Sequence, residues 1–300
     1  MSLIPQEALK HQSGNEIKCA ASLIEPAHQT VSPVFKTDNF ALYQDDCLLT
    51  LSHFPANYVD MIFADPPYML SNDGFTCQNG RMVKVNKGKW DKSKGFEEDA
   101  VFHESWISEC RRVLKPEGTI WISGTYHSIY QCGYILQKLG FHILNDIAWF
   151  KPNAAPNLSC RFFTASHETV LWARKDKGAK HTFNYETVKN GIYAEDPLKK
   201  PNTQMRSVWS IPTPRPNEKT QGKHPTQKPI ALLKRIVESS TKDGDIILDP
   251  FNGGGTTGIA SLMVGNRKYI GCEIDQGYIE LTIKRYNEFY DQTLIPGLDR

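Results

Sequence analysis

The chain has 300 residues, of which 40% are hydrophobic, and a formal net charge of +2. This length suits one large α/β domain with an ample core. No apolar run is long enough to span a bilayer and no signal peptide opens the chain, so we expect no membrane association and a cytoplasmic location. The seven cysteines are scattered without a Cys-x-x-Cys pair, which favours reduced thiols over disulfides or a metal site.

Strands and helices are predicted to alternate along the chain. The predicted strands are 40–43, 59–64, 119–123, 146–151, 168–174, 245–248 and 268–272, and the predicted helical segments are 47–56, 98–115, 127–139, 228–240, 259–263 and 276–290. Residues 1–36 show little periodicity and are interpreted as an N-terminal extension. Residues 71–95 are interpreted as a long loop. The alternation predicts a doubly wound, mostly parallel α/β sheet.

Positive charge is concentrated in two segments. Residues 81–94 carry six Lys or Arg against one Asp, and residues 151–223 carry thirteen against six Asp or Glu. The rest of the chain is therefore net acidic. This distribution predicts a surface for a polyanion. Solvated surface lysines are the alternative for either segment alone.

A short motif, Asp65-Pro66-Pro67-Tyr68, follows the apolar run 61–64. The run is typical of a buried strand, and the prolines end it. The motif brings together a carboxylate, rigid backbone carbonyls and an aromatic ring. This set suits a flat heterocycle with an amino group, because the acid accepts from the amino group and the ring stacks. A plain strand end with a turn is the alternative.

A glycine-rich motif, 249–258, follows the apolar run 245–248 and leads into a predicted helix. Its Gly253, Gly255 and Gly258 match the Gly-x-Gly-x-x-Gly spacing of nucleotide-binding strand–turn–helix units. The glycines let a ligand approach the backbone, and the helix N-terminus favours negative charge.

An acidic residue follows the glycine motif at the sequence separation that is typical of a ribose-binding acid. About twenty residues on, the strand 268–272 leads into Glu273, where an acid accepts hydrogen bonds from ribose hydroxyls. With strands on both sides of the glycines and this acid in place, the sequence predicts an adenosine-type cofactor.

Together these segments resemble the β class of DNA amino-methyltransferases of restriction–modification systems, which use S-adenosylmethionine. Residues 65–68 match the catalytic motif of the family, 249–258 match its cofactor motif, and 223–229 resemble the segment that closes its cofactor pocket. The resemblance covers residues 38–290, and the catalytic motif comes first, as in the β class. It implies a circularly permuted, Rossmann-like methyltransferase fold with a small target-recognition insertion.

The resemblance is strongest to the N6-adenine enzymes, which begin the motif with Asp, whereas N4-cytosine enzymes more often carry Ser there. It implies methyl transfer to adenine in a short recognition sequence, with the base flipped out of the duplex and attacked directly. The implied catalytic residues are Asp65, Pro66, Pro67 and Tyr68. Asp65 and the Pro66 carbonyl accept the amino hydrogens, and Tyr68 stacks on the base.

The cofactor residues are expected in and beside the motifs. They are Asp46, Asp65, His224, Thr226, Asp249, Pro250, Phe251, Asn252, Gly253, Gly255, Thr256, Thr257, Glu273 and Asp275. Asp46 and Asp275 also suit helix caps, and the two threonines suit a cap, the cofactor carboxylate or both. His224 is better explained as a structural residue than as a general base.

The DNA surface is predicted from the basic segments. Its candidates are Lys84, Lys87, Lys89, Arg161, Arg174, Lys199, Lys200, Arg206 and Arg215. The proposed division is an extension 1–36, a catalytic half 37–175 with the loop 71–95, a target-recognition insertion 176–222 and a cofactor half 223–300. Segments around residues 71–74 and 157–161 resemble adenine enzymes of GATC-type systems. The family also implies double-stranded or single-stranded DNA as substrate, a paired restriction endonuclease and a homodimer.

The sequence bears on four alternatives to adenine methylation. C5-cytosine enzymes are disfavoured because no cysteine of the chain follows a proline. N4-cytosine methylation stays open. The intact catalytic motif argues against a silent cofactor-binding subunit, and the basic segments and the motif order argue against a protein-glutamine methyltransferase.

Overall fold

The computed structural model describes residues 31–69, 75–78, 81–84 and 91–294. Its helices are α1 Cys47–Ser52, α2 Phe96–Val113, α3 Ile129–Lys138, α4 Tyr185–Asn190, α5 Ile230–Ser240, α6 Thr256–Val264 and α7 Gln276–Leu294. Its strands are β1 Phe35–Lys36, β2 Phe40–Gln44, β3 Val59–Ala64, β4 Phe75–Gln78, β5 Arg81–Lys84, β6 Leu114–Gly124, β7 His142–Phe150, β8 His167–Arg174, β9 Val208–Ser210, β10 Ile246–Asp249 and β11 Lys268–Glu273. None of the described helices is long and apolar enough to cross a membrane.

Within these described ranges, nine strands form one sheet in the order β1-β2-β11-β10-β3-β6-β8-β7-β9. Strands β2, β11, β10, β3 and β6 are parallel, whereas β8 is antiparallel to both β6 and β7. The late strands β10 and β11 therefore lie between the early strands β2 and β3, as the circular permutation requires. The predicted doubly wound, mostly parallel sheet is confirmed.

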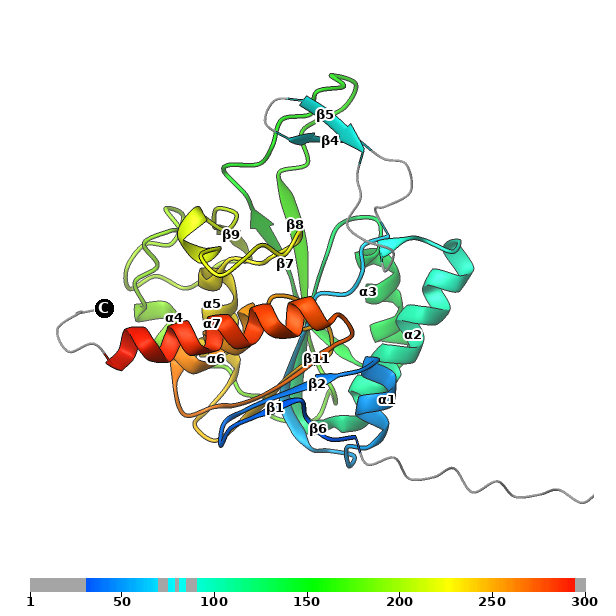
Figure 1. The fold of residues 1–300 in the computed structure, drawn as a ribbon, viewed down its shortest axis with the longest axis vertical. Helices are drawn as coiled ribbons and strands as arrows, with labels where there is room; N and C mark the ends of the chain where they lie inside the picture. Colours follow the sequence, from blue (N-terminus) through cyan, green and yellow to red (C-terminus); the bar gives the residue numbers. More distant parts are fainter. Residues whose placement is uncertain (1–30, 70–74, 79–80, 85–90, 295–300) are drawn as a thin grey trace, which may run out of the picture. The chain divides into compact units, whose positions relative to one another are not determined.

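Helices cover both faces of this sheet (Figure 1). Helices α1, α2 and α3 pack on one face, and α5, α6 and α7 pack on the other. Along β3, Ile62 and Ala64 belong to the first core cluster, and Met61 and Phe63 belong to the second. Successive strand residues point to opposite faces, and here both faces are buried. That is why this strand is a continuous apolar run in the sequence.

The interpretation of residues 71–95 as a loop is wrong for part of the segment. Strands β4 and β5 form an antiparallel hairpin, with Phe75 opposite Lys84 and Gln78 opposite Arg81. The sequence carried the signal, because Asn79-Gly80 between two runs rich in Phe, Thr, Met and Val is typical of a two-residue hairpin turn. The high content of Gly, Asn and Lys obscured it.

Two segment boundaries also differ from the prediction. The expected extension 1–36 ends too late, because β1 pairs with β2 and belongs to the sheet; residues 1–30 lie outside the described part. Strand β6 begins at Leu114, five residues before the expected start. Its first residue pairs with Val59 across a register shift, so the Lys-Pro-Glu-Gly turn signal lies within the strand.

The segment 176–222 is partly built into the main fold. Strand β9 pairs in parallel with β7, and its Trp209 is buried in the core. Asp196 forms a buried ion pair with Arg235 of α5 at 2.7 Å. The Arg235 guanidinium also lies 4.3 Å from the centre of the Tyr193 ring. These contacts give several aromatic and charged residues of the segment a structural role.

Candidate active site

The carboxyl ends of β2, β11, β10 and β3 lie at one edge of the sheet, and the two sequence motifs meet there. Asp65 follows β3, Asp249 ends β10 and Glu273 ends β11. A cavity of about 790 Å³ is lined by residues of both motifs. Parallel α/β sheets bind their ligands at this edge.

Most of the predicted cofactor residues line this cavity. Those that do are Asp46, Asp65, His224, Thr226, Asp249, Pro250, Phe251, Asn252, Gly253, Thr256, Thr257 and Glu273. Gly255 and Asp275 are not part of the wall. Pro67 of the catalytic motif also lines it, whereas Tyr68 lies deeper.

The three glycines of the late motif have different structural roles. Gly253 and Gly255 have φ angles of +51° and +73°, in the left-handed region that glycine adopts at little cost. A Cβ at Gly258 would lie 2.6 Å from the Phe40 ring, so this glycine allows α6 to pack closely on the sheet. The turn residues bring the backbone to the ligand, and the third glycine sets the position of the helix.

Asp249 holds the glycine loop against α6. Its carboxylate accepts the Phe251 N–H at 3.0 Å and the Thr257 hydroxyl at 2.6 Å. Burial raises the pKa of Asp249 to about 7. Thr257 is therefore bonded to Asp249, and the Thr256 hydroxyl accepts from Arg285 at 3.0 Å.

Glu273 and Asp46 each combine a structural contact with a place on the cavity wall. Glu273 accepts the Gly253 N–H at 2.7 Å and the Asp275 N–H at 2.9 Å, and burial raises its pKa. Asp46 caps α1 by accepting the Leu48 N–H at 2.7 Å. The cap and the cofactor contact considered for Asp46 are thus geometrically compatible.

The side chains of two predicted cofactor residues are hydrogen-bonded within the protein. Asp275 is exposed and accepts the N–H groups of Gly277 and Tyr278 at the start of α7, so the cap explains it and the cofactor assignment does not. Asn252 reaches the wall, but its side-chain amide is bonded to Thr282 at 2.9 Å and to Tyr269 at 2.8 Å. Both acids and amides are common in such motifs, and sequence alone does not give their direction.

His224 closes one side of the cavity. Its ring packs against Tyr278 with centroids 4.3 Å apart, and its Nδ1 accepts the Thr226 N–H at 3.3 Å. A Cβ at Gly253 would lie 3.2 Å from this ring. These packing contacts agree with the structural role expected for His224.

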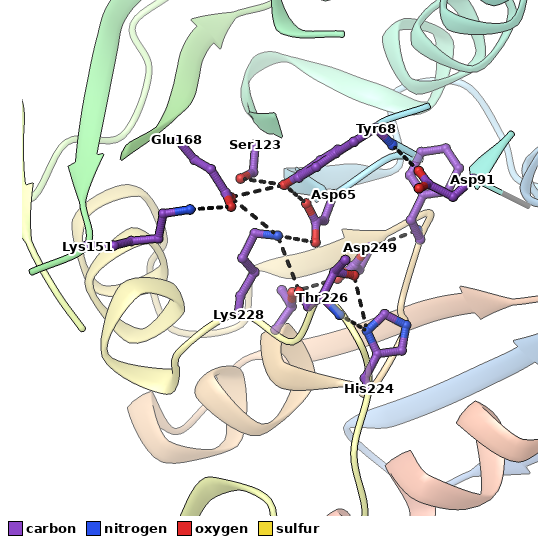
Figure 2. A network of polar contacts seen from close by, with 12 residues as sticks. Asp65, Tyr68, Asp91, Ser123, Lys151, Glu168, His224, Thr226, Lys228 and Asp249 are labelled. Carbon is purple, nitrogen blue, oxygen red and sulfur yellow. Dashed lines mark hydrogen bonds and ion pairs between the residues drawn. The ribbon is translucent and has the colours of Figure 1, made fainter. Parts of the chain in front are cut away.

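A buried network of charges surrounds Asp65 (Figure 2). The Lys228 ammonium lies 2.5 Å from Asp65 Oδ2, and the Tyr68 hydroxyl donates to Asp65 Oδ1. Glu168 lies beyond them, with its Oε2 3.2 Å from the Tyr68 hydroxyl and 3.7 Å from Lys228. Lys151 pairs with the other Glu168 oxygen at 3.0 Å. Two carboxylates thus face two ammonium groups with little contact to solvent.

The opposite charges of this network favour each other's ionised forms. Burial raises the pKa of Asp65, and the Lys228 ammonium opposes that rise. Burial alone would raise the pKa of Glu168, but Lys228 and Lys151 outweigh it and hold the pKa below its ordinary value. Burial likewise disfavours the charge of Lys228, yet its two carboxylate partners raise its pKa. Lys228 therefore stays protonated and is unsuited to act as a base.

Tyr68 takes a different position from the one expected for a stacking ring. It is only 5% exposed, and its hydroxyl lies 3.2 Å from Ser123 in addition to its bond with Asp65. Its N–H donates to the buried Asp91 at 2.8 Å. The hydroxyl occupies the side of Asp65 on which an amino group would bind, so an amino group has to replace it.

The sequence motifs alone do not predict the partners of Asp65. Lys228 lies inside the segment 223–229, which resembles the segment that closes the cofactor pocket in the family, and that resemblance implies no role for the lysine itself. Glu168 and Lys151 are more than fifteen residues apart and reach the site from β8 and from the end of β7. A Lys and a Glu beside apolar strand residues were the available signal, and only the sheet order brings them together.

The predicted DNA-binding residues are distributed unevenly. Lys84 lies on β5, and Lys87 and Lys89 lie outside the described residues. Arg161, Lys200, Arg206 and Arg215 are exposed, whereas Lys199 donates to the carbonyls of Lys189 and Lys200 at 2.8 Å. Arg174 ends β8 opposite Thr119 of β6, on the side of the sheet away from Asp65.

Comparison with known proteins identifies the family. A model of the DNA methylase family matches residues 59–284, which is most of the chain. The chain belongs to the DNA methylase family. It is 48% identical over 262 residues to the Type II methyltransferase M2.MboI of Moraxella bovis, covering 86% of this chain and 92% of the relative. It is 48% identical to M2.DpnII of Streptococcus pneumoniae, covering 84% and 91%.

Solved structures of methylases have the same fold. The structure of the M1.HpyAVI–SAM complex is 28% identical with a TM-score of 0.60, covering 83% of this chain and 99% of that one. The cytosine-N4-specific PvuII DNA methyltransferase has a TM-score of 0.65 at 18% identity, covering 88% and 95%, and this likeness concerns the fold. The methylase is thus an S-adenosylmethionine-dependent DNA methyltransferase.

The cavity fits this cofactor. It has room for a nucleoside with an amino-acid tail, since small-molecule sites of this kind are about 300–1,000 Å³. The Gly253 turn brings backbone to its wall, Glu273 and Asp46 supply acceptors, and Phe251 supplies an apolar surface. Asp65 lies on the same wall, so the cavity that fits the cofactor also contains the Asp65 carboxylate.

Proposed function

We propose that this methylase transfers a methyl group to the N6 amino group of adenine within a short recognition sequence of DNA. The observation that carries the proposal is the Asp65 carboxylate, which faces the same cavity as the glycine turn. An aspartate in the first motif position supports adenine over cytosine. N4-cytosine methylation is the alternative. The experiment below tests it as well, because this protein shares its fold with the cytosine-N4-specific PvuII enzyme.

Asp65 and the Pro66 carbonyl prepare a weak nucleophile. The adenine amino nitrogen shares its lone pair with the ring, so it attacks poorly while it is planar. With one N–H donated to Asp65 and the other to the Pro66 carbonyl, the nitrogen becomes tetrahedral and its lone pair is localised. S-adenosylmethionine supplies an electrophilic methyl group on a sulfonium. The protein's contribution is orientation and a negative charge beside the nitrogen as it becomes cationic.

Tyr68 changes partner when the target base arrives. The base has to leave the duplex, because its amino group is otherwise paired and stacked inside it. The amino group then replaces the Tyr68 hydroxyl on Asp65. Release of that hydrogen bond leaves the aromatic ring available to stack on the adenine.

The DNA surface extends from this edge of the sheet over exposed basic residues. Its members include Arg161, Lys200, Arg206 and Arg215. Lys84 of β5 is a further candidate. Arg174 is left out because it lies on the side of the sheet away from Asp65. The relatives are Type II methyltransferases, which supports a restriction endonuclease of the same specificity as functional partner, in a bacterial cytoplasm. A GATC-like target and a homodimer are further parts of this proposal.

The base can be identified with labelled S-adenosylmethionine. The protein is incubated with synthetic duplexes in which one strand lacks adenine or lacks cytosine, and with unmethylated genomic DNA digested to nucleosides. We expect label in N6-methyl-2′-deoxyadenosine only. Label in N4-methylcytosine would show that cytosine is the target base and would refute the adenine proposal. Label in protein glutamine and none in any DNA would refute both.

A further inference from the structure

Lys228 is a buried cation beside Asp65 that lies outside the motif 65–68. It is 5% exposed, and its ammonium lies 2.5 Å from Asp65 Oδ2, 3.7 Å from Glu168 Oε2 and 5.0 Å from the centroid of the Tyr68 ring. A buried ammonium is costly unless it is paired, and this one is shared by two carboxylates. Such an arrangement has to serve Asp65, because Lys228 makes its shortest contact there.

We propose that Lys228 is a positioning residue that keeps Asp65 ionised and turned toward the substrate, with Glu168 and Lys151 balancing its charge. The inference rests on the proposed role of Asp65. With Oδ2 held by Lys228, only Oδ1 is left for the incoming amino group. The carboxylate thus cannot rotate away from the cavity, and it keeps the negative charge that the amine needs during transfer.

Glu168 has the opposite influence on Asp65. Its carboxylate repels the charge of Asp65 and raises the pKa of that group, whereas Lys228 lowers it. Lys151 moderates Glu168 from the other side at 3.0 Å. The arrangement therefore makes a two-sided prediction, in which loss of the cation and loss of the second carboxylate shift the Asp65 titration in opposite directions.

The experiment compares Lys228→Met with Glu168→Gln. Tritiated S-adenosylmethionine and unmethylated genomic DNA give kcat/KM from pH 4.5 to 9, and the acidic limb of this profile reports the ionisation of Asp65. Protonation of Asp65 stops transfer, so a higher pKa of Asp65 moves the midpoint of the acidic limb to higher pH. We expect Lys228→Met to move this midpoint up by about 1–3 pH units and Glu168→Gln to move it to lower pH. The double variant should fall between them.

A merely structural role gives a different result. If Lys228 only supports packing, both variants lose activity equally at every pH and the limb stays where it is in the wild type. Unshifted limbs, or shifts in the same direction, overturn the proposal. Cofactor affinity measured by calorimetry shows that each variant is folded. If Asp65→Ala itself retains activity, the proposed function fails instead, which separates the two conclusions.

A second, independent observation concerns the segment between β7 and β8. It leaves the sheet at the edge that carries Asp65, and Lys151 N–H donates to the Ser166 carbonyl at 2.7 Å where its two ends meet. Between those ends, Phe162 and Phe163 are 71% and 96% exposed. The Asn157 side-chain amide donates to the Phe162 carbonyl at 2.6 Å. Large apolar side chains held out into solvent mark an interaction surface.

We infer that Phe163 is the wedge that enters the base stack when the target base leaves it. The inference rests on the proposed base flipping. Residues 151–166 contain Lys151 and Arg161 and no acid, which suits approach to a phosphate backbone. An apolar side chain inserted between base steps compensates for the lost stacking. The segment's roots at Lys151 and Glu168 connect this wedge to the network around Asp65.

Single-stranded and double-stranded forms of one circular phage DNA test this wedge. Only the duplex has a stack to open, so Phe163→Ala should lower duplex methylation about 5- to 150-fold, which corresponds to the 1–3 kcal/mol of a base–aromatic contact, and leave single-strand methylation near wild type. Phe163→Trp should restore the duplex rate. Tyr134→Ala, an exposed aromatic on α3, is the matched control and should change neither. Equal losses on both DNA forms, or none, refute the inference.

Discussion

Asp65 lines the cavity and belongs to the buried charge network, and it is the proposed acceptor for the amino group of the substrate. Replacement by Ala removes the acceptor and the negative charge beside the reacting nitrogen, so we expect kcat to fall about 10²–10³-fold or more. Cofactor affinity, measured by calorimetry, should change little. Asp275→Ala is the matched control, because this exposed acid at the same edge only caps α7 and should cost about 1 kcal/mol of stability at unchanged kcat. Retained activity in Asp65→Ala would remove Asp65 from the mechanism.

Asp249 makes stability depend on pH. Its pKa is about 7 in the folded protein against an ordinary 3.8. Between about pH 4 and pH 7 the folded state therefore binds more protons than the unfolded state, and the free energy of unfolding falls as pH rises, by about 1.4 kcal/mol per unit of pKa difference. Asp249→Asn should flatten this slope in urea unfolding at pH 5 and pH 7. Parallel slopes in the two proteins would contradict the assignment.

At the scale of elements, the turn into α6 depends on Gly255. It has φ +73°, and a Cβ added there would lie 2.7 Å from Thr282 Oγ1. Gly244 has a similar φ of +86° with nothing within 4 Å of the added Cβ. Both Ala variants carry the left-handed strain, but Gly255→Ala also overpacks, so it should lose about 1–3 kcal/mol more. Urea denaturation measures the free energy of unfolding of both variants. Equal losses would show that the Thr282 side chain moves aside at no cost in stability.

At the scale of the whole molecule, the small net charge of +2 combines two basic segments with a net acidic remainder. We expect the Kd for DNA to rise about 10-fold or more between 50 and 200 mM salt, because phosphate contacts release counterions. Arg161→Ala and Arg215→Ala should each lower the slope of log Kd against log salt by about 1. Lys268→Ala, at the amino end of β11, serves as control. An equal effect of all three would mean that the charges act only through net charge.

Much of the fold was predictable because local signals agreed with it. The strand 59–64 was predicted at its observed bounds, since both of its faces are buried and it forms an unbroken apolar run. The hairpin at 75–84 was missed because polar composition outweighed the Asn-Gly turn signal. Strand β9 was missed because its three residues gain their stability from pairing with β7 and from burial of Trp209.

The sequence by itself determined the chemistry: a carboxylate after one strand, a glycine turn after another, and the order that implies circular permutation. Those are local features, set by residue type and spacing along the chain. Only the tertiary structure decided what surrounds Asp65, because Glu168 lies on β8, Lys151 directly follows the paired strand β7, and Lys228 comes from the segment before α5, far from Asp65 in the sequence. Burying these charges costs much less free energy when opposite charges are buried together. That proximity follows from the sheet order, which brings the catalytic motif and its partners to one edge.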